Sequence, residues 1–464
     1  MTIKHVSYAI SEWKKRAPLY QLYRDYYDGN HALKFASKYF QREYGDLVKQ
    51  LRENLCPTVV NAFTDRLAIS SWTGSDDDAD VLGESVEQGL SRLLNMVNRE
   101  AFRCGDAYAL VWDGGDGTPK PRFHRADQIV PHVDPIDPDR LDWAAKVWID
   151  PDTGRGRVNV YYADRVEQYA TRNQLQTEGV QAKFTDFPDS DSAWLPWADD
   201  DGPEVIPHEY GAVPVLWFRR DADENAGYGR SILADVIPLQ DALNKSVADL
   251  VVLSERYSRP FWYLLNHQPP QPRLDPATGK PEDPTIRLNQ RRFNPNEQTI
   301  FTTDGPGPFG QLDPPDMTRL LQIQDGYALK IARVVGIPAY YLTQTSGDVP
   351  SGESLRVLSS RLTAGVVDFQ QDTTPVWRGL MQLLGFDDAQ PVWAPAAELD
   401  EMEKLQAAVI KRNDLGYSQE DVLYDLGEVD VDGILARSRA ERANVGQVAV
   451  DAFRRGEDPA EALR

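Results

Sequence analysis

Apolar residues recur at intervals of three and four between residues 231 and 254, which is the spacing of one face of a helix. The positions that share this face are Leu239, Leu243, Val247, Leu250, Val251 and Ser254. We expect Ser231 to cap the helix and Arg259-Pro260 to end it, because proline disfavours helix in the residue before it. Pro238 lies inside the pattern and predicts a kink or a fresh first turn.

The same period returns after Asp316, which is expected to cap a second helix. The apolar positions of this stripe are Leu320, Ile323, Tyr327, Ile331, Val334 and Val335. Gly336 followed by Pro338 predicts its end. Two segments of about 20 residues, at about 1.5 Å per residue, predict rods roughly 30 Å long. The pattern fits two core helices joined by a surface loop, and it also fits a two-helix column with a separate module at its tip.

The insert between these helices, residues 257–312, is rich in proline and arginine. Short strands are expected near residues 261–265 and 298–302. The insert is close to neutral within an acidic chain, and it contains a basic run from Arg287 to Arg292. It fits a solvated loop, and equally a contact surface for a partner or a polyanion.

In residues 103–220, apolar and polar residues alternate, and turn sequences interrupt this alternation; the helical spacing is no longer present. Two hairpins are predicted: residues 107–113 with the stretch up to Phe123, and residues 144–150 with 157–163. Two further strands are predicted at residues 165–171 and 213–219. Residues 186–207, rich in Asp, Pro and Trp, are expected to form an ordered surface loop. A hairpin-built sheet attached to helices predicts the α+β class.

The two ends of the chain are predicted to be helical. Near the N-terminus, one stripe consists of Leu19, Leu22, Tyr23, Tyr26 and Tyr27. After a polar stretch that follows Pro338, Ser351 is expected to cap another helix, in which Pro375 predicts a kink or a new start. From Glu398 onward the chain is charged and helical in character.

Composition and charge narrow the function classes. Of 464 residues, 41% are hydrophobic and 26% charged, as in soluble globular proteins. A net charge of −22 weighs against a conventional DNA-binding protein, but suits one through which DNA slides without sticking. Two cysteines, Cys56 and Cys104, exclude a disulfide framework and favour buried thiols in a reducing compartment. No apolar run approaches about 18 residues, so we expect a cytosolic protein without a membrane-spanning helix.

The sequence predicts no cofactor, no metal ion and no catalytic residues. Residues 305–310 match the pattern GxGxxG, but prolines fill the variable positions and no helix follows at once, so a dinucleotide loop is rejected. The six histidines never pair at metal-ligand spacing. The acidic run Asp76, Asp77, Asp78 and Asp80 favours a loop before a helix N-terminus over a magnesium site. Carboxylates are so plentiful that paired-carboxylate catalysis stays open.

Five segments make the chain resemble a known family, and they occur in this order: YRDYYDGNHALKF, NLCPTVVNAFTDRLAI, GRSILADVIPLQDALNKSVADLVV, GIPAYYL and SGESLRVLSSRL. Together they resemble the portal proteins of long-tailed bacteriophages, in the branch common among phages of actinobacteria. The resemblance runs from about Leu19 to Leu384. It rests on the order of the segments and on the helix–insert–helix layout, because none of the segments is catalytic. Trp72 departs from the family, whose members often carry a glycine-phenylalanine pair there.

The resemblance implies a mostly helical α+β portal fold and a ring, typically of twelve subunits, at one vertex of the capsid. It divides the chain into a hairpin-built α/β wing (1–225 and 351–395), a stem of two long helices (226–256 and 313–338), a small α/β clip (257–312), a tunnel loop (339–350) and a helical crown (396–464). The ring would form the channel for packaging and ejection of double-stranded DNA.

The resemblance also implies the contact residues. In the tunnel loop, which narrows the channel, the candidate DNA-facing residues are Tyr341, Thr343, Gln344, Thr345, Ser346 and Asp348. In the clip, which docks the terminase and later the head–tail adaptor, the candidate contacts are Arg287, Arg291 and Arg292. The resemblance also implies contacts with the major capsid and scaffold proteins and no contact with a membrane. It implies that the protein is part of the virion and is assembled in the host cytoplasm. Two alternatives stay open: a capsid or tail structural protein without a channel, and a soluble enzyme.

Overall fold

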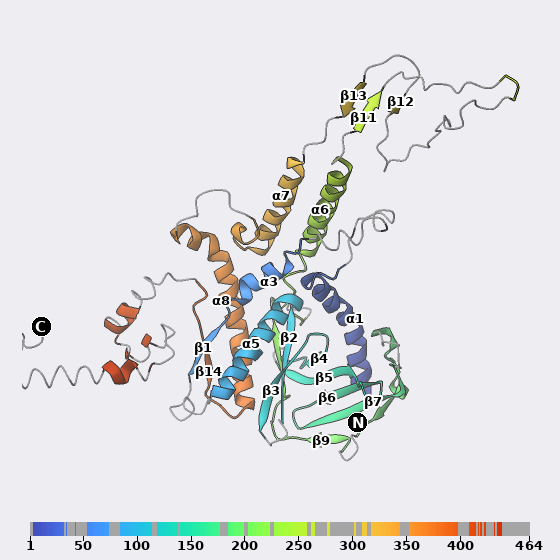
Figure 1. Ribbon diagram of the computed structural model, residues 1–464. Coiled ribbons are helices and arrows are strands. Elements are labelled where there is room, and N and C mark those ends of the chain that lie inside the picture. The colour runs from blue at the N-terminus through green and yellow to red at the C-terminus, as the bar shows by residue number, and fades with distance from the viewer. Residues whose placement is uncertain are drawn as a thin grey trace, which may run out of the picture.

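A computed structural model gives the fold of the chain (Figure 1). The described residues are 3–31, 53–73, 84–113, 118–137, 140–176, 184–198, 203–222, 227–257, 261–264, 301–302, 309–312, 317–343 and 352–397, with short pieces and single residues elsewhere, such as 276–278, 408–413 and 434–438. Two helices stand side by side as a column on a body of helices and sheets, and small strands lie at the far end of the column (Figure 1).

The predicted class, α+β, is confirmed. The α-helices are α1 (Ile3–Tyr27), α3 (Cys56–Thr64), α5 (Glu84–Cys104), α6 (Ile237–Tyr257), α7 (Thr318–Val335) and α8 (Gly352–Leu383), with short 3₁₀ turns η1 (Phe184–Asp186), η2 (Asp191–Ala193) and η3 (Ala339–Tyr341). The column is the α6–α7 pair, which encloses the proline-rich insert. Of the two layouts that the sequence left open, the structure shows the column.

In the described part of the chain, the strands form four sheets. They are β1 (Ile69–Thr73), β2 (Asp106–Asp113), β3 (Pro119–His124), β4 (Ile129–Val133), β5 (Leu141–Ile149), β6 (Arg155–Tyr161), β7 (Arg165–Gln174), β8 (Trp194–Pro196), β9 (Val205–Pro207), β10 (Val215–Arg219), β11 (Phe261–Leu264), β12 (Phe301–Thr302), β13 (Phe309–Leu312) and β14 (Gln390–Trp393). The sheet orders are β4-β5-β6-β7-β8 with β9 also on β7, β10-β2-β3, β1-β14 and β12-β11-β13. The predicted antiparallel hairpins β2–β3 and β5–β6 are confirmed.

Helix α1 joins the sheets to the helical part of the body, because its buried face meets two cores in turn. Its first half presents apolar residues at helical spacing to the six-stranded sheet; they are Val6, Ala9, Ile10, Trp13 and Ala17. Its second half buries Tyr20, Tyr23 and Tyr26 among α3, α5, α8 and β2. The predicted stripe was therefore partly wrong: Tyr20 is buried, whereas Leu19 is 37% exposed.

Three local predictions differ from the structure. Ser231 does not cap α6: it caps a preceding turn, where its Oγ accepts the Leu233 N–H at 3.0 Å. Helix α6 itself begins at Ile237 with Pro238 in its first turn, which confirms the fresh start predicted at Pro238. Helix α8 continues through Pro375, so of the two predictions made there, a kink or a new start, the new start is wrong. Residues 186–207 do more than cover the surface, because Phe187 and Trp194 are buried in the sheet core.

The sequence predicts neither a membrane-spanning helix nor a metal site, and the described part of the chain bears on both predictions. None of the helices there is both long and apolar enough to span a membrane. Among the same residues, no three His, Cys, Asp or Glu side chains gather closely enough to hold a metal ion. Cys56 and Cys104 are buried free thiols, as expected.

We expect acid to destabilise the fold through His124, the last residue of β3. Burial, together with the nearby Lys146, lowers the pKa of His124 from 6.5 to about 4. The folded protein therefore binds this proton less readily than the unfolded chain does. Its contribution to stability is full above pH 6.5 and is lost as the pH falls from 6.5 towards about 4, by about 3 kcal/mol in total.

Urea denaturation at a series of pH values measures this effect. The free energy of unfolding of the His124→Gln variant should fall less steeply than that of the wild type over this pH window. Parallel pH profiles for the two proteins would show that His124 is not the group responsible.

Candidate interface of the helix hairpin

The α6–α7 hairpin is fixed to the body by a close crossing of two backbone segments. A Cβ atom at Gly229 would lie 1.9 Å from the carbonyl oxygen of Gly105, and Gly105 itself has φ of +94°. Only glycine allows such an approach and such a backbone conformation. Two backbone hydrogen bonds stabilise the crossing: Arg220 N–H donates to Gly105 O at 2.9 Å, and Ile232 N–H donates to Phe102 O at 3.1 Å. The chain leading into α6 is thereby held against the end of α5.

The carboxylate of Asp106, next to this crossing, collects four donors. Tyr20 Oη and Arg16 Nη2 donate to Oδ2 at 2.7 and 3.2 Å, while Trp217 Nε1 and the Gly229 N–H donate to Oδ1 at 2.9 and 2.8 Å. The side chain of Asp106 is fully buried, and burial raises its pKa. Helix α1, strand β10 and the segment before α6 are therefore tied to one buried group at the start of β2.

The base of α6 is also held by polar side chains that lie inside the protein. Gln240 Nε2 donates to Glu53 O at 2.6 Å, and Gln240 Oε1 accepts the Leu55 N–H at 3.1 Å. Asp241 accepts from Tyr26 Oη at 2.6 Å. Gln240 is 0% and Asp241 4% exposed. Buried polar groups need such partners, so these bonds fix both the position and the rotation of α6. The apolar stripe in the sequence gives no sign of them.

Helix α7 packs on α6 along one face and ends as the sequence predicts. Its buried residues are Ala328, Ile331 and Ala332. Gly336 closes the helix in the left-handed region at φ of +85°, where its N–H donates to Ala332 O at 2.8 Å. Ile337 follows as a buried residue, which returns the chain to the main core.

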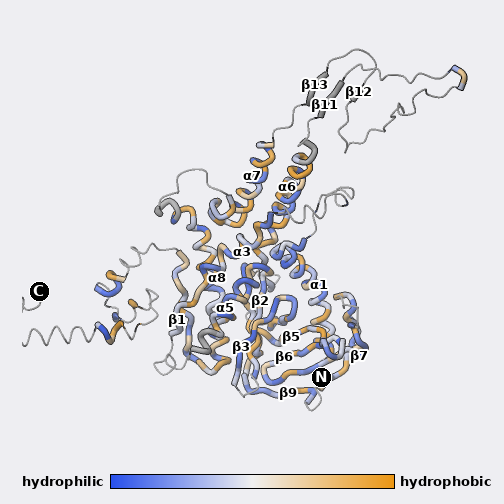
Figure 2. Tube along the Cα trace, in the orientation of Figure 1, coloured by the Kyte–Doolittle hydropathy of each residue, from blue (hydrophilic) through white to orange (hydrophobic). Residues whose placement is uncertain are grey.

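Apolar residues of α7 also lie in contact with solvent. Leu321, Ile323, Leu329 and Val334 are 49%, 47%, 44% and 47% exposed. Ile323 and Val334 belong to the predicted stripe, so that stripe is wider than one neighbouring helix covers. Figure 2 shows apolar positions along the whole length of α7. Grouped exposed apolar side chains mark protein–protein contacts, and this surface is the candidate subunit interface.

The turn after α7 shows where the predicted loop begins. Tyr341 packs against the main core, and its hydroxyl accepts from Arg66 Nη2 at 3.2 Å. Thr343 Oγ1 donates to Ala339 O at 3.0 Å. Both predicted loop residues therefore hold the base of the loop in this chain. The other predicted contacts, Gln344, Thr345, Ser346, Asp348, Arg287, Arg291 and Arg292, lie outside the described residues.

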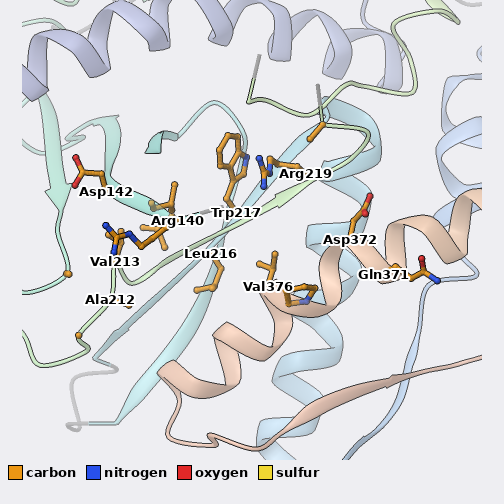
Figure 3. A pocket seen from close by; sticks show the side chains of 16 residues that line it. Arg140, Asp142, Ala212, Val213, Leu216, Trp217, Arg219, Gln371, Asp372 and Val376 are labelled. Carbon is orange, nitrogen blue, oxygen red and sulfur yellow. The ribbon is translucent and has the colours of Figure 1, made fainter. Parts of the chain in front are cut away.

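A pocket of about 860 Å³ lies between β10 and α8 (Figure 3). Trp217 and Arg219 line it from β10, and Asp372 and Val376 line it from α8. Burial and the neighbouring Asp368 raise the pKa of Asp372. None of the described residues lining the pocket is a His, Cys or Ser. The lining does include two carboxylates, Asp142 and Asp372.

The chain is similar in sequence to known proteins. The model of a family described as phage portal protein, SPP1 Gp6-like, matches residues 6–385. The portal protein of Mycobacterium phage D29 is 24% identical over 239 residues, covering 51% of this chain and 45% of that protein. This chain thus spans less than half the length of that curated relative.

Two solved structures are also similar in chain arrangement. One is from the neck of an empty gene transfer agent (GTA) particle, computed with C6 symmetry; it is 14% identical, with 80% of this chain and 89% of that chain covered and a TM-score of 0.45. The other is from the neck of a native GTA particle, computed with C12 symmetry; it is 13% identical, with 85% and 94% covered and a TM-score of 0.42.

The glycine crossing predicts a sharp difference between two substitutions. Gly229→Ala places a Cβ against the Gly105 backbone and should lower the free energy of unfolding by about 3 kcal/mol or more. Gly89→Ala is the matched control: its Cβ meets nothing within 4 Å, and α5 should gain up to about 1 kcal/mol. Urea denaturation compares the two variants. Equal stabilities would contradict the role given to the crossing.

Proposed function

Because this chain belongs to the phage portal protein family, we propose that it assembles into a ring, of about twelve subunits, at one vertex of the capsid. The ring forms the channel through which double-stranded DNA is packaged and ejected. The observation that supports this proposal best is the column: α6 is fixed to the body, while α7 keeps apolar side chains exposed along its length. Such a surface is suited to repeated contact with a second copy.

Head-to-tail contact explains why apolar surface lies on more than one side of α7. In a ring, each subunit offers one surface to the preceding copy and a different one to the next. At 100° per residue, Leu329 lies on one flank of the helix and Ile323 and Val334 lie on the other, while Leu321 lies on the same side as the buried Ala328 and Ala332. Covering one half-exposed apolar side chain contributes roughly 1 kcal/mol, and each contact recurs in every subunit.

The division of the chain follows the same proposal. The packed body, residues 1–225 and 351–395, is the wing, and 226–256 with 313–338 form the stem. The clip, 257–312, carries the small β11–β12–β13 sheet at the tip of the column, and it docks the terminase and the head–tail adaptor through Arg287, Arg291 and Arg292. Residues 396–464 are the crown, which faces the capsid and scaffold proteins.

The tunnel loop, 339–350, connects α7 to α8. Tyr341 and Thr343 are bonded at its base, so we assign them to positioning the loop. Gln344, Thr345, Ser346 and Asp348 are then the residues that meet DNA. The virion is the place of action, and the host cytoplasm is the place of assembly. The family is not an enzyme family, and no catalytic step is part of this proposal.

Electron microscopy of the purified protein tests the ring directly. Wild-type protein, alone or with its scaffold and capsid proteins, should show rings with a central hole. The variant Ile323→Ser/Leu329→Ser, which changes one residue on each flank of α7, should assemble at least tenfold less while keeping its unfolding temperature, because both side chains are exposed in the single chain. Ile136→Ser/Leu195→Ser, exposed on the body next to β4 and in β8, should assemble normally. Wild-type protein that stays monomeric with all partners present would contradict the proposal.

Shortening the loop tests its role in holding DNA. Deletion of residues 344–349, which spares Tyr341 and Thr343, should leave ring assembly unchanged and reduce retention of packaged DNA. The measurement is the fraction of full heads that remain full over time, in a packaging assay with wild-type and shortened rings. Unchanged retention would remove the DNA-facing assignment of these residues.

A further inference from the structure

Three aromatic rings form a stack where the first turns of α1 meet the six-stranded sheet. The indole of Trp143 in β5 lies nearly parallel to the imidazole of His132 in β4, with 4.8 Å between the ring centroids. The imidazole of His5 in α1 stacks on the same indole, with 4.7 Å between the centroids and 8° between the planes. Trp143 is 1% exposed. A buried indole is therefore in contact with two groups that can each gain a charge close to neutral pH.

The two imidazoles lie on opposite faces of this indole. His132 is the cross-strand neighbour of Trp143, so it approaches the indole from the β4 side of β5. The strand on the other side of β5 is β6, and Tyr162 follows its last residue. His5 Nδ1 and Tyr162 Oη form a hydrogen bond of 2.9 Å, which places the His5 ring on the β6 side. The indole thus lies between two groups that repel each other once both are protonated.

The groups around the stack balance such charges only in part. The titratable and charged groups that face it are Tyr8 and Glu12 of α1, Asp142 of β5, Tyr162 after β6, and Arg165 and Glu167 of β7. Asp142 Oδ2 lies 3.8 Å from His132 Nδ1, but its side chain is 56% exposed, so water weakens its attraction. Glu167 is already bound by Arg165 Nε at 3.0 Å and by Tyr169 Oη at 2.8 Å. A positive charge on the stack therefore gains little from either carboxylate.

The closed stack favours the neutral form of His5. Burial, together with the charge that His132 would carry, lowers the pKa of His5 below its ordinary value of 6.5. When the first turns of α1 leave the sheet, His5 returns to water and its pKa returns to that ordinary value. The closed form therefore binds this proton less readily than the open form does. Its stability is full above pH 6.5 and is lost as the pH falls below that value.

We propose that the stack of His5, Trp143 and His132 is a pH-sensitive latch, which holds residues 3–10 of α1 on the sheet at neutral pH and releases them in mild acid. The latch lies within one chain and does not rest on the proposed function. Opening one terminal segment costs less free energy than global unfolding, so a change of charge at two imidazoles is enough to control it. Release would uncover three side chains that are 0% exposed on the sheet core: Val6, Ala9 and Ile10.

Hydrogen exchange of the full chain, read by mass spectrometry of its peptides, measures how often these turns open. Exchange is compared between about pH 5 and about pH 7.5, on either side of the ordinary pKa of histidine, and is corrected for the intrinsic effect of pH on exchange. The test variant, His5→Phe/His132→Phe, keeps two rings that can stack on Trp143 but cannot take up a proton. The matched control, His124→Gln, removes a buried histidine from β3, which belongs to another sheet.

In the wild type, the corrected exchange of residues 3–10 should be about tenfold faster at the lower pH, the effect of one unit of pKa difference. The buried second half of α5 should show no such change, and the His124→Gln protein should behave as the wild type does. In the test variant, the ratio of the two rates should fall to about one. A wild-type ratio near one would overturn the inference, and so would a test variant that keeps the full ratio.

A pair of single variants separates the charge from the loss of the ring, and it decides the question alone if the double variant does not fold. His5→Lys and His5→Gln both remove the imidazole, but only the lysine carries a permanent positive charge. At about pH 7.5, residues 3–10 should exchange severalfold faster in His5→Lys than in His5→Gln, because the charge acts without added acid. Equal exchange in the two variants would show that charge at this position does not open the helix, and the latch would be refuted.

Discussion

The buried carboxylate of Asp106 is the point on which the rest of the structure depends. It lies at the start of β2, and its donors come from α1, β10 and the segment that enters α6. Removing a charge from water is costly unless its hydrogen-bonding capacity is filled, so these four groups must keep their relative positions. The neighbouring contact of Gly105 with Gly229 leaves no room for a different path. Together they set the place at which the column leaves the body.

The two helices of the column have different roles because of how each is held. Gln240 and Asp241 bind α6 to the body through buried hydrogen bonds whose geometry tolerates little rotation. Helix α7 lies against α6, and its buried residues Ala328, Ile331 and Ala332 belong to the main core. Leu329, Ile323 and Val334 of α7 remain between 44% and 47% exposed. A helix fixed to the body, beside a helix with exposed apolar side chains, is an arrangement suited to assembly.

The distribution of charge follows the same division. The chain is strongly acidic as a whole, which favours repulsion of nucleic acid over most of its surface. The basic residues Arg319, Lys330 and Arg333 gather on a single side of α7, next to a flank formed by Ile323 and Val334. The residues that attract nucleic acid and those that repel it are thus separated in space within one subunit. Rotation about a ring axis would repeat that separation in every copy.

The sequence by itself determined the features that depend on near neighbours. Periodicity predicted the α6–α7 pair, Pro238 predicted the start of α6, Gly336 predicted the end of α7, and turn sequences predicted the β2–β3 and β5–β6 hairpins. Tertiary structure alone decided which faces are covered, because burial depends on segments far apart in the chain. It placed Tyr20 inside and Leu19 outside, left Ile323 and Val334 exposed within an apolar stripe, and gave Asp106 partners up to 123 residues away. Local spacing carries no record of such partners, since each contact is made only when the whole chain has folded.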